Sequence, residues 1–594
     1  MPPQKPYEGP SRKLVLAFDV GTTYSGVAYA TLDPGETPKI QAVTRFPGQS
    51  NSDFKIPSVL LYTQDGQVRA VGAEAKDPRM EMAIEDEDLI LVEWFKLHLV
   101  PSSMESSIGL KDLDVQHKLP PGKTIVEVFA DFLSYMYKCA RDYIMEASPN
   151  GTSLWNSVQD RIEIVLGHPN GWEGLQQEKM REAAILAGLV PDNHIGQSRV
   201  HFVSEGEASL HYCVDMGMTK DFEDGTSAIV IDAGGGTVDL STYCFRNMSP
   251  ISVEETAPAE CVLQGSTRVN VRAAELLRSK LANTKFSNEL DIKAMLDTFE
   301  KTAKPNFKDS AEESFVKFGS IRDRDPGVGI KNGQLSLEGA EVSKLFEPSI
   351  EAIVDAVQKQ KEETLEPISF AFLVGGFAAS AWLFTKLKEH LSVFDISLSR
   401  PDHHANKAVA VGAASFFLEH FVSVRVARWT YGSSCSVEYD DSNPEHRLRQ
   451  HKTYMMPSAV RVIPEGFKNI VAKGTRLREG EERIESFERE VEDPWGLNHI
   501  AMEITCYRGK NKEPHWVDLE PEYFSDLCIV TADTSGVTKV RQFGPLGPYY
   551  AQTFKLVLSC GKTETTAHIR WEENGIERRG PAKIVYDDDA RIAQ

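Results

Sequence analysis

Two glycine-rich segments carry the residue types that can hold a phosphate group. They are DVGTTYSG (Asp19–Gly26) and DAGGGTVD (Asp232–Asp239), and each follows a short apolar run. Glycines let backbone N–H groups approach a ligand without a Cβ in the way, and successive N–H groups in such a turn form a hollow that binds anions. Thr22, Thr23 and Thr237 add hydroxyl donors. Two such loops that face each other would hold a polyphosphate from both sides.

The aspartate that opens each segment predicts a metal ion beside the phosphates. Asp19 and Asp232 each stand where an apolar strand is expected to end, at the mouth of a sheet. Mg²⁺ prefers oxygen ligands and loses its water reluctantly, so we expect the two aspartates to hold it through water. A third glycine pair, Gly375–Gly376, ends another apolar run, FAFLV. A single glycine turn is weak evidence, whereas three at the ends of apolar runs favour a nucleotide site over plain turns.

Strands and helices must position these loops, and the hydrophobic pattern predicts both. Residues 14–30 and 228–243 share the order apolar strand, Asp, any residue, Gly, small residues, apolar strand. A repeat at this distance predicts two similar lobes, because solenoid periods are far shorter. Apolar residues at helical spacing predict helices over 124–144 and 342–357, and strands alternate with helices as in α/β proteins. After about residue 425, short apolar runs broken by Pro and Gly predict a mainly β region. Residues 499–507 are one such run.

Composition narrows the class of protein. The 594 residues suffice for about three or four core-forming units. A net charge of −22 argues against binding to nucleic acid, and no segment is apolar and long enough to enter a membrane. The eight cysteines form no C-x-x-C pair, and the N-terminus has no apolar signal core. These features predict an intracellular protein, cytoplasmic with a nuclear location left open, that has a flexible tail over residues 1–11.

Together these segments resemble the superfamily of actin, sugar kinases and heat-shock-70 chaperones. DVGTTYSG, DAGGGTVD and LVGG are similar to its first phosphate, second phosphate and adenosine motifs, and GGGT followed by an apolar residue and Asp is typical of heat-shock-70 members. IPSVLLY with VGAEAK resembles an early β-hairpin of that family, and SEGEASL stands where the family has an Asn-Glu-Pro motif. The G-x-x-x-x-G-K-[ST] loop and the protein-kinase motifs are missing, which excludes those two classes.

The resemblance covers about residues 14–420. It implies an α/β fold in which a two-lobed actin-like ATPase domain, a duplicated ribonuclease-H-like fold, spans residues 12–422. A mainly β, sandwich-like domain without a helical lid would follow over 423–594. The protein is thus identified as a member of the heat-shock-70 family, in a divergent branch that resembles heat shock 70 kDa protein 12 and its fungal relatives.

The resemblance also implies roles for single residues. Asp19 and Asp232 would be the metal ligands. The residues that would act in hydrolysis are Lys96, Glu205, Asp232, Asp19, Thr237 and Asp239. The residues that would bind the nucleotide are Gly21, Thr22, Thr23, Tyr24, Gly234, Gly235, Gly236, Thr237, Lys304, Gly375, Gly376 and Phe377.

Several of these roles have structural alternatives. Lys96 stands where the family has a lysine near the γ-phosphate, and its alternative is an exposed lysine on a helix. Asp239 either orients water or is only a strand-end carboxylate. Pro169 either relays the nucleotide state or merely begins a loop. Phe377 either stacks on the base or belongs to the core.

The implied function is that of an ATP-binding, ATP-hydrolysing chaperone-like protein that uses ATP or ADP with Mg²⁺. Its β domain would bind unfolded polypeptide or a specific protein partner. The motif GSTRVN (Gly265–Asn270), the segment FAAS (Phe377–Ser380) and the missing linker and lid depart from the family pattern. They leave two alternatives open, a nucleotide-dependent signalling or scaffold protein with little turnover, and a small-molecule kinase of the same fold.

Overall fold

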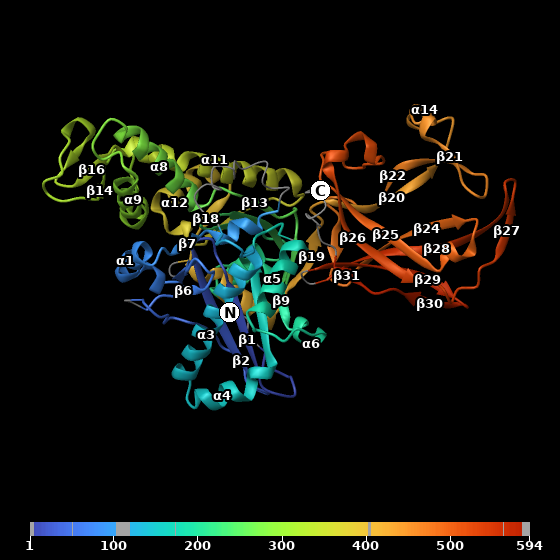
Figure 1. Cartoon of the computed structure of the whole chain (residues 1–594), viewed down its shortest axis with the longest axis horizontal. Helices are drawn as coiled ribbons and strands as arrows, with labels where there is room; N and C mark the ends of the chain where they lie inside the picture. Colours follow the sequence, from blue (N-terminus) through green and yellow to red (C-terminus); the bar gives the residue numbers. More distant parts are fainter. Residues whose placement is uncertain are drawn as a thin grey trace. The chain divides into compact units, whose positions relative to one another are not determined.

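A computed structural model (Figure 1) describes residues 5–49, 52–101, 119–172, 174–401, 405–561 and 564–584. The chain divides into two units, which we describe separately. Unit 1 comprises Met1–Trp172 and Gln176–Val422, and unit 2 comprises Ser423–Gln594 together with the short segment Glu173–Leu175.

Unit 1 contains two sheets with the same topology. The first sheet has, in order across it, β3 (Ile40–Ala42), β2 (Tyr24–Leu32), β1 (Lys13–Asp19), β8 (Ile162–His168) and β9 (Val200–Ser204). The second has β12 (Ile251–Glu255), β11 (Val238–Met248), β10 (Ser227–Ala233), β17 (Phe370–Val374) and β18 (Ser397–Ser399). In both sheets the central strand pairs antiparallel with the strand that follows its glycine loop and parallel with a strand far along the chain. The sequence repeat is therefore also a repeat of strand order and direction.

Helices cover these sheets, and their apolar faces form the cores of unit 1. The longer ones are α3 (Ile125–Ala147), α5 (Leu175–Leu186), α8 (Ser266–Leu281), α11 (Gly339–Glu363) and α12 (Ala381–Ser392). The predicted helices over 124–144 and 342–357 correspond to α3 and α11. Thr124 begins α3 with a capping box, in which its side chain and that of Glu127 each accept the other's backbone N–H.

Two helices cross closely behind the site. They are α7 (Glu205–Asp215) and α13 (Ala408–Leu418). A Cβ placed on Gly412 of α13 would lie 1.7 Å from the carbonyl oxygen of Ala208 on α7. Only glycine permits this approach, so the crossing sets the position of α7 and of the side chains it carries.

Two local expectations need adjustment. In the predicted hairpin of IPSVLLY and VGAEAK, β5 (Val59–Tyr62) does pair with β6 (Val68–Val71), but Glu74–Lys76 is a 3₁₀ turn. Gly72, with φ +66°, turns the chain out of the strand. In the predicted tail, Tyr7 is held by backbone hydrogen bonds to Glu36 (2.9 Å) and from Gly35 (2.8 Å).

Unit 2 is mainly β, as predicted for the region after residue 425. One sheet has, in order, β21 (Tyr454–Met455), β22 (Arg461–Val471), β20 (Thr430–Glu438), β25 (His499–Tyr507) and β26 (Phe524–Asp533). The other has β24 (Glu482–Val491), β28 (Gly547–Cys560), β29 (Thr565–Glu573) and β30 (Ile576–Arg579), with β27 (Arg541–Gly544) beside β28. The inward residues of both sheets, such as Ile504 and Leu556, share one core. Across the residues that the structure describes, no helix has the length and apolarity needed to cross a membrane.

Candidate functional site

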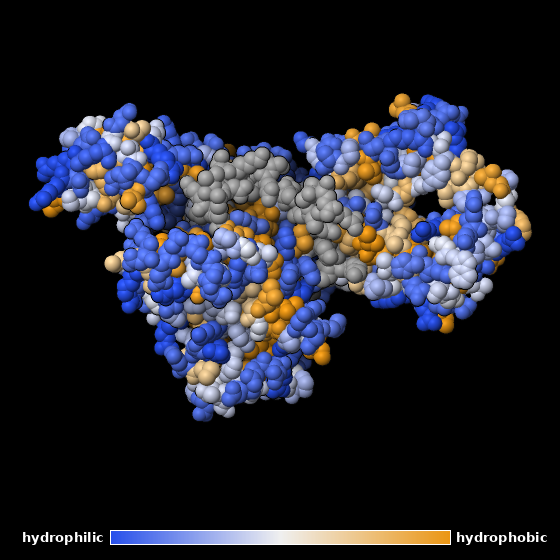
Figure 2. Space-filling view, viewed as in Figure 1, coloured by the Kyte–Doolittle hydropathy of each residue, from blue (hydrophilic) through white to orange (hydrophobic). Residues whose placement is uncertain are grey.

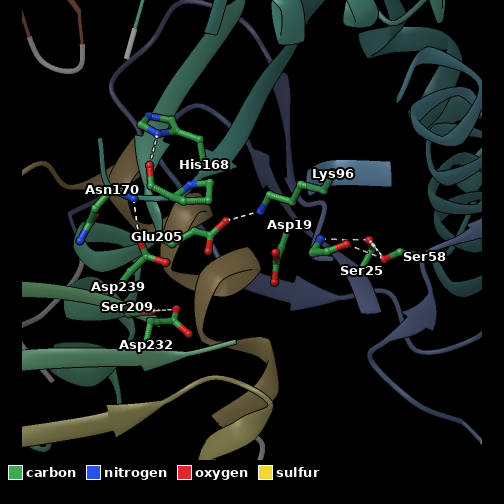
Figure 3. Close-up of polar contacts among 12 residues, drawn as sticks. Asp19, Ser25, Ser58, Lys96, His168, Asn170, Glu205, Ser209, Asp232 and Asp239 are labelled. Carbon is green, nitrogen blue, oxygen red and sulfur yellow. Dashed lines mark hydrogen bonds and ion pairs between the residues drawn. The ribbon is translucent and has the colours of Figure 1, made fainter. Parts of the chain in front are cut away.

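Four carboxylates lie close to the glycine loops of unit 1 (Figure 3). Asp19 ends β1, Asp232 and Asp239 flank the second glycine loop on β10 and β11, and Glu205 is the first residue of α7. Asp232 and Asp239 are direct cross-strand partners. All four residues are buried, and none has more than 7% of its surface exposed. Like charges that face each other across a strand pair repel, so this cluster needs a positive charge.

Two lysines supply part of that charge. Nζ of Lys96 lies 2.5 Å from Oε1 of Glu205, and Nζ of Lys55 forms an ion pair with Oδ2 of Asp19. Lys96 is buried in the 3₁₀ helix Phe95–Leu99, with 3% of its surface exposed. The alternative of an exposed helical lysine is therefore wrong. The left-handed backbone of Trp94 (φ +55°) turns the chain into this 3₁₀ helix, which a helical spacing could not predict.

Hydrogen bonds orient the two aspartates of the second loop. The hydroxyl of Ser209 on α7 donates to Oδ2 of Asp232 at 2.7 Å. The backbone N–H of Asn170 donates to Oδ1 of Asp239 at 2.6 Å. Asn170 also donates through Nδ2 to Leu240, Ser241 and Glu260, so the loop after β8 is latched to the second sheet. Pro169 lies in this loop, and its carbonyl accepts a hydrogen bond from Nδ1 of His168 at 2.9 Å.

Burial shifts the protonation of the cluster. It raises the pKa of Asp232 to about 7, with the charges of Glu205 and Asp19 acting in the same direction and the Ser209 hydrogen bond opposing them. Burial, followed by the charge of Glu205, raises the pKa of Asp239 well above its usual range. Burial also raises the pKa of Glu205, although Lys96 opposes that shift. Burial by itself lowers the pKa of Lys96, but the carboxylates of Glu205 and Asp19 outweigh it and raise the pKa.

The charge balance of the cluster would therefore favour a bound divalent cation. When ionised, the carboxylates of Asp19, Glu205, Asp232 and Asp239 carry two more charges than the ammonium groups of Lys55 and Lys96. A hydrated Mg²⁺ would neutralise the excess, and its water ligands could span carboxylates that are not in direct contact. Within the described ranges, no three His, Cys, Asp or Glu side chains come close enough together to hold a metal ion directly.

The two glycine loops lie directly against each other. A Cβ on Gly235 would lie 2.4 Å from Oγ1 of Thr23, and one on Gly236 would lie 2.5 Å from Oγ1 of Thr22. The side chains of the first loop therefore lie directly against the glycines of the second. Larger residues at either glycine would push the loops apart.

The backbone of the second loop is oriented by the start of α8. The N–H groups of Ser266, Thr267 and Gly265 donate to the carbonyls of Gly234, Gly235 and Gly236, at 3.1, 2.9 and 3.1 Å. In a planar trans peptide the C=O and the following N–H point in opposite directions. The N–H groups of Gly235, Gly236 and Thr237 therefore point away from α8, as an anion hollow requires.

Hydroxyl groups hold the first loop in a similar way. The N–H of Gly21 donates to Oγ of Ser25 at 3.1 Å, and Oγ of Ser58 donates to the Gly21 carbonyl at 2.7 Å. A Cβ on Gly21 would lie 2.2 Å from the carbonyl oxygen of Tyr24, so this turn needs glycine. Thr22 is buried, whereas Tyr24 is 52% exposed.

The residues expected at the adenosine end fall into two groups. Gly375 has φ +91°, and a Cβ there would lie 2.4 Å from Oδ1 of Asp232, so this glycine does approach the cluster, while Gly376 is exposed. Phe377 is buried and stacks on Phe346 with ring centroids 6.1 Å apart, which favours the core interpretation. Nζ of Lys304 is buried and donates to Oδ1 of Asn270 at 2.8 Å, and its burial lowers the pKa of Lys304.

Four residues that position the site had no role predicted for them. They are Lys55, Ser58, Asn170 and Ser209. Lys55 lies 36 residues from the aspartate it contacts, and Asn170 lies 69 residues from Asp239. Lys55 directly precedes the motif IPSVLLY, and Ser58 is its third residue. Ser209 lies one helical turn after Glu205. These positions in the sequence are the signals that could have indicated the three residues.

Comparison with known proteins finds distant relatives. No protein-family model matches the chain. Human heat shock 70 kDa protein 12B is 24% identical over 515 residues, which cover 71% of this chain and 71% of that protein. Human heat shock 70 kDa protein 12A is 24% identical over 62% of this chain and 64% of its own length. The chaperone protein DnaK of Buchnera aphidicola is 23% identical over 67% of this chain and 58% of its own length. The match thus spans less than two thirds of the latter two relatives. The chain is a distant homologue of the heat-shock-70 proteins.

Proposed function

We propose that unit 1 is an actin-like nucleotide-binding domain that binds ATP and ADP with Mg²⁺ and hydrolyses ATP. One observation carries the proposal, namely that two opposed glycine loops lie against a buried cluster of carboxylates and lysines. The repeated strand order of the two sheets supports the actin-like assignment, as does the homology to heat-shock-70 proteins.

The roles follow from the positions of the side chains. The N–H groups of Gly235, Gly236 and Thr237, with the hydroxyls of Thr22 and Thr23, would bind the phosphate oxygens. Asp19 and Asp232 would hold the hydrated Mg²⁺, which when bound neutralises phosphate charge. Lys96 would approach the γ-phosphate, with Glu205 holding its ammonium in place. Asp239, with its raised pKa, is suited to orient or accept a proton from the attacking water.

The β unit supports a chaperone-like role less directly. The two sheets of unit 2 share a core as in a sandwich, and large apolar side chains lie exposed on it, among them Trp495 (76%), Phe543 (79%) and Leu546 (63%). Figure 2 shows such apolar residues at the surface of unit 2. Binding of unfolded polypeptide that differs between the ATP and ADP forms would support a chaperone. A lack of binding in both forms would leave the alternative, a nucleotide-dependent signalling or scaffold protein.

The nucleotide site is tested by thermal unfolding with ATP or ADP, each with Mg²⁺ or with a chelator. Nucleotide with Mg²⁺ should stabilise the protein in proportion to the logarithm of its concentration, about 2.7 kcal/mol at 100 times the dissociation constant. Asp19→Asn should abolish the Mg²⁺-dependent part. A wild-type protein that no nucleotide stabilises would overturn the proposal.

A further inference from the structure

Lys55 is a second cation of the site, half-buried, and the structure holds it there from several sides. It directly precedes β4 (Ile56–Pro57), which pairs with the first residues of β2 after the glycine loop. Its carbonyl accepts a hydrogen bond from Gln49 at 2.6 Å. A Cβ on Gly26 would lie 3.3 Å from Cδ of Lys55, so the lysine stem crosses β2 where there is no side chain. Lys55 is thus built into the site.

The ammonium of Lys55 has a direct carboxylate partner in the cluster. It contacts Oδ2 of Asp19, with 11% of the lysine side chain and 7% of the aspartate side chain exposed. The lysine therefore already neutralises a carboxylate that is also proposed to hold the hydrated Mg²⁺.

Resting on the proposed Mg²⁺–nucleotide function, we propose that Lys55 is an internal counter-cation that competes with Mg²⁺ for Asp19. Lys55 pairs with Oδ2 of Asp19, so water on a bound Mg²⁺ would compete with the ammonium for the charge of this carboxylate. Lys55 therefore raises the Mg²⁺ concentration at which nucleotide binds.

Competition is the expected result for two cations at one buried carboxylate. The ion pair is strong because little water screens it, and a second cation gains less from a carboxylate that is already neutralised. Such a coupling is reciprocal, so the lysine weakens the metal as much as the metal weakens the lysine contact. Lys96 differs, because its direct partner is Glu205 and not Asp19.

The test is a Mg²⁺ titration of ADP-linked thermal stabilisation in full-length variants. Lys55→Met keeps the apolar stem and removes the charge, and its Mg²⁺ midpoint should fall about tenfold relative to wild type. Lys55→Arg keeps the charge and should stay near wild type. Lys13→Met is the matched control, because it breaks the ion pair of β1 with Glu163 (2.6 Å) and should lower stability without moving the midpoint.

An unchanged or higher midpoint in Lys55→Met would overturn the proposal. If that variant does not fold, amine labelling of the wild-type protein, measured by mass spectrometry, tests the proposal instead. Mg²⁺ alone, without nucleotide, should raise the labelling of Lys55, and equal labelling with and without Mg²⁺ would contradict the competition. This measurement also separates the two proposals, since it holds even if no nucleotide stabilises the wild-type protein.

Discussion

Asp232 shows at the scale of one residue how the site costs stability. It is buried, faces Asp239 across a strand pair and receives one hydrogen bond, from Ser209. Its pKa of about 7 lies above the ordinary value of 3.8 that it has in the unfolded chain. Between these pH values the folded protein binds more protons than the unfolded chain, so stability falls as the pH rises through this window. A buried carboxylate that lowers the stability of the folded protein is typical of a functional site.

Asp232→Asn should therefore stabilise the nucleotide-free protein at pH 8 by about 2 kcal/mol, because the buried charge is removed. The advantage should shrink as the pH falls from about 7 toward 4, where Asp232 of the wild type is protonated. Urea unfolding of both proteins at several pH values measures the difference. The same variant should lose Mg²⁺-dependent stabilisation by ADP.

Asp160→Asn, at an exposed position, is the control and should leave the pH curve unchanged. Should Asp232→Asn be less stable than wild type at pH 8, the ionised carboxylate would be paired more favourably than its burial indicates.

At the scale of elements, α7 carries the site and depends on its crossing with α13. Glu205 and Ser209 project from one side of α7 toward the cluster. The other side of the helix lies so close to α13 that Gly412 faces the backbone of Ala208. The position of Glu205 is thus set by a glycine that is about 200 residues away in the sequence.

Gly412→Val should force the two helices apart, because its Cβ would otherwise lie 1.7 Å from the Ala208 carbonyl oxygen. We expect a loss of about 3 kcal/mol in the stability of unit 1 and weaker nucleotide binding in the fraction that folds. Chemical unfolding and a nucleotide titration measure the two effects. Val411→Ala, a half-buried neighbour on the same helix, should cost only about 1 kcal/mol and keep nucleotide affinity. Equal effects of both variants would argue against the crossing as the cause.

At the scale of the whole molecule, each unit has hydrophobic clusters of its own. The clusters around Leu16, Ile231 and Val203 contain residues of unit 1, and the cluster around Ile504 contains residues of unit 2. Among the described residues, no cluster draws its buried members from both units. Separate cores are the usual basis for separate cooperative unfolding.

Calorimetry of the full chain should therefore show two unfolding transitions. ADP with Mg²⁺ should raise one of them, since a ligand stabilises only the unit that binds it. Gly412→Val should lower that same transition and leave the other in place. One transition that shifts as a whole would show instead that the units unfold together.

Much of unit 1 could be predicted because the signals are local. The strands before Asp19 and Asp232 are continuous apolar runs, and α3 and α11 have regular apolar stripes, so each was recognisable within its own segment. The glycine loops and their aspartates were found for the same reason. Phe377 could not be assigned, because an aromatic residue after a glycine pair suits both a base and a core, and its stacking on Phe346 decides the matter only in three dimensions.

The sequence by itself predicts which loops could bind phosphate, since glycine, aspartate and threonine must be adjacent in the chain to form such a turn. Only the tertiary structure decided which charged groups lie beside these loops and which hydrogen bonds orient them. Lys55, Lys96, Asn170 and Ser209 reach the site from four separate segments, and each contact depends on packing between them. The tertiary structure also decided the protonation of the cluster, because the pKa of Asp232 depends on how far the whole fold excludes water from its carboxylate.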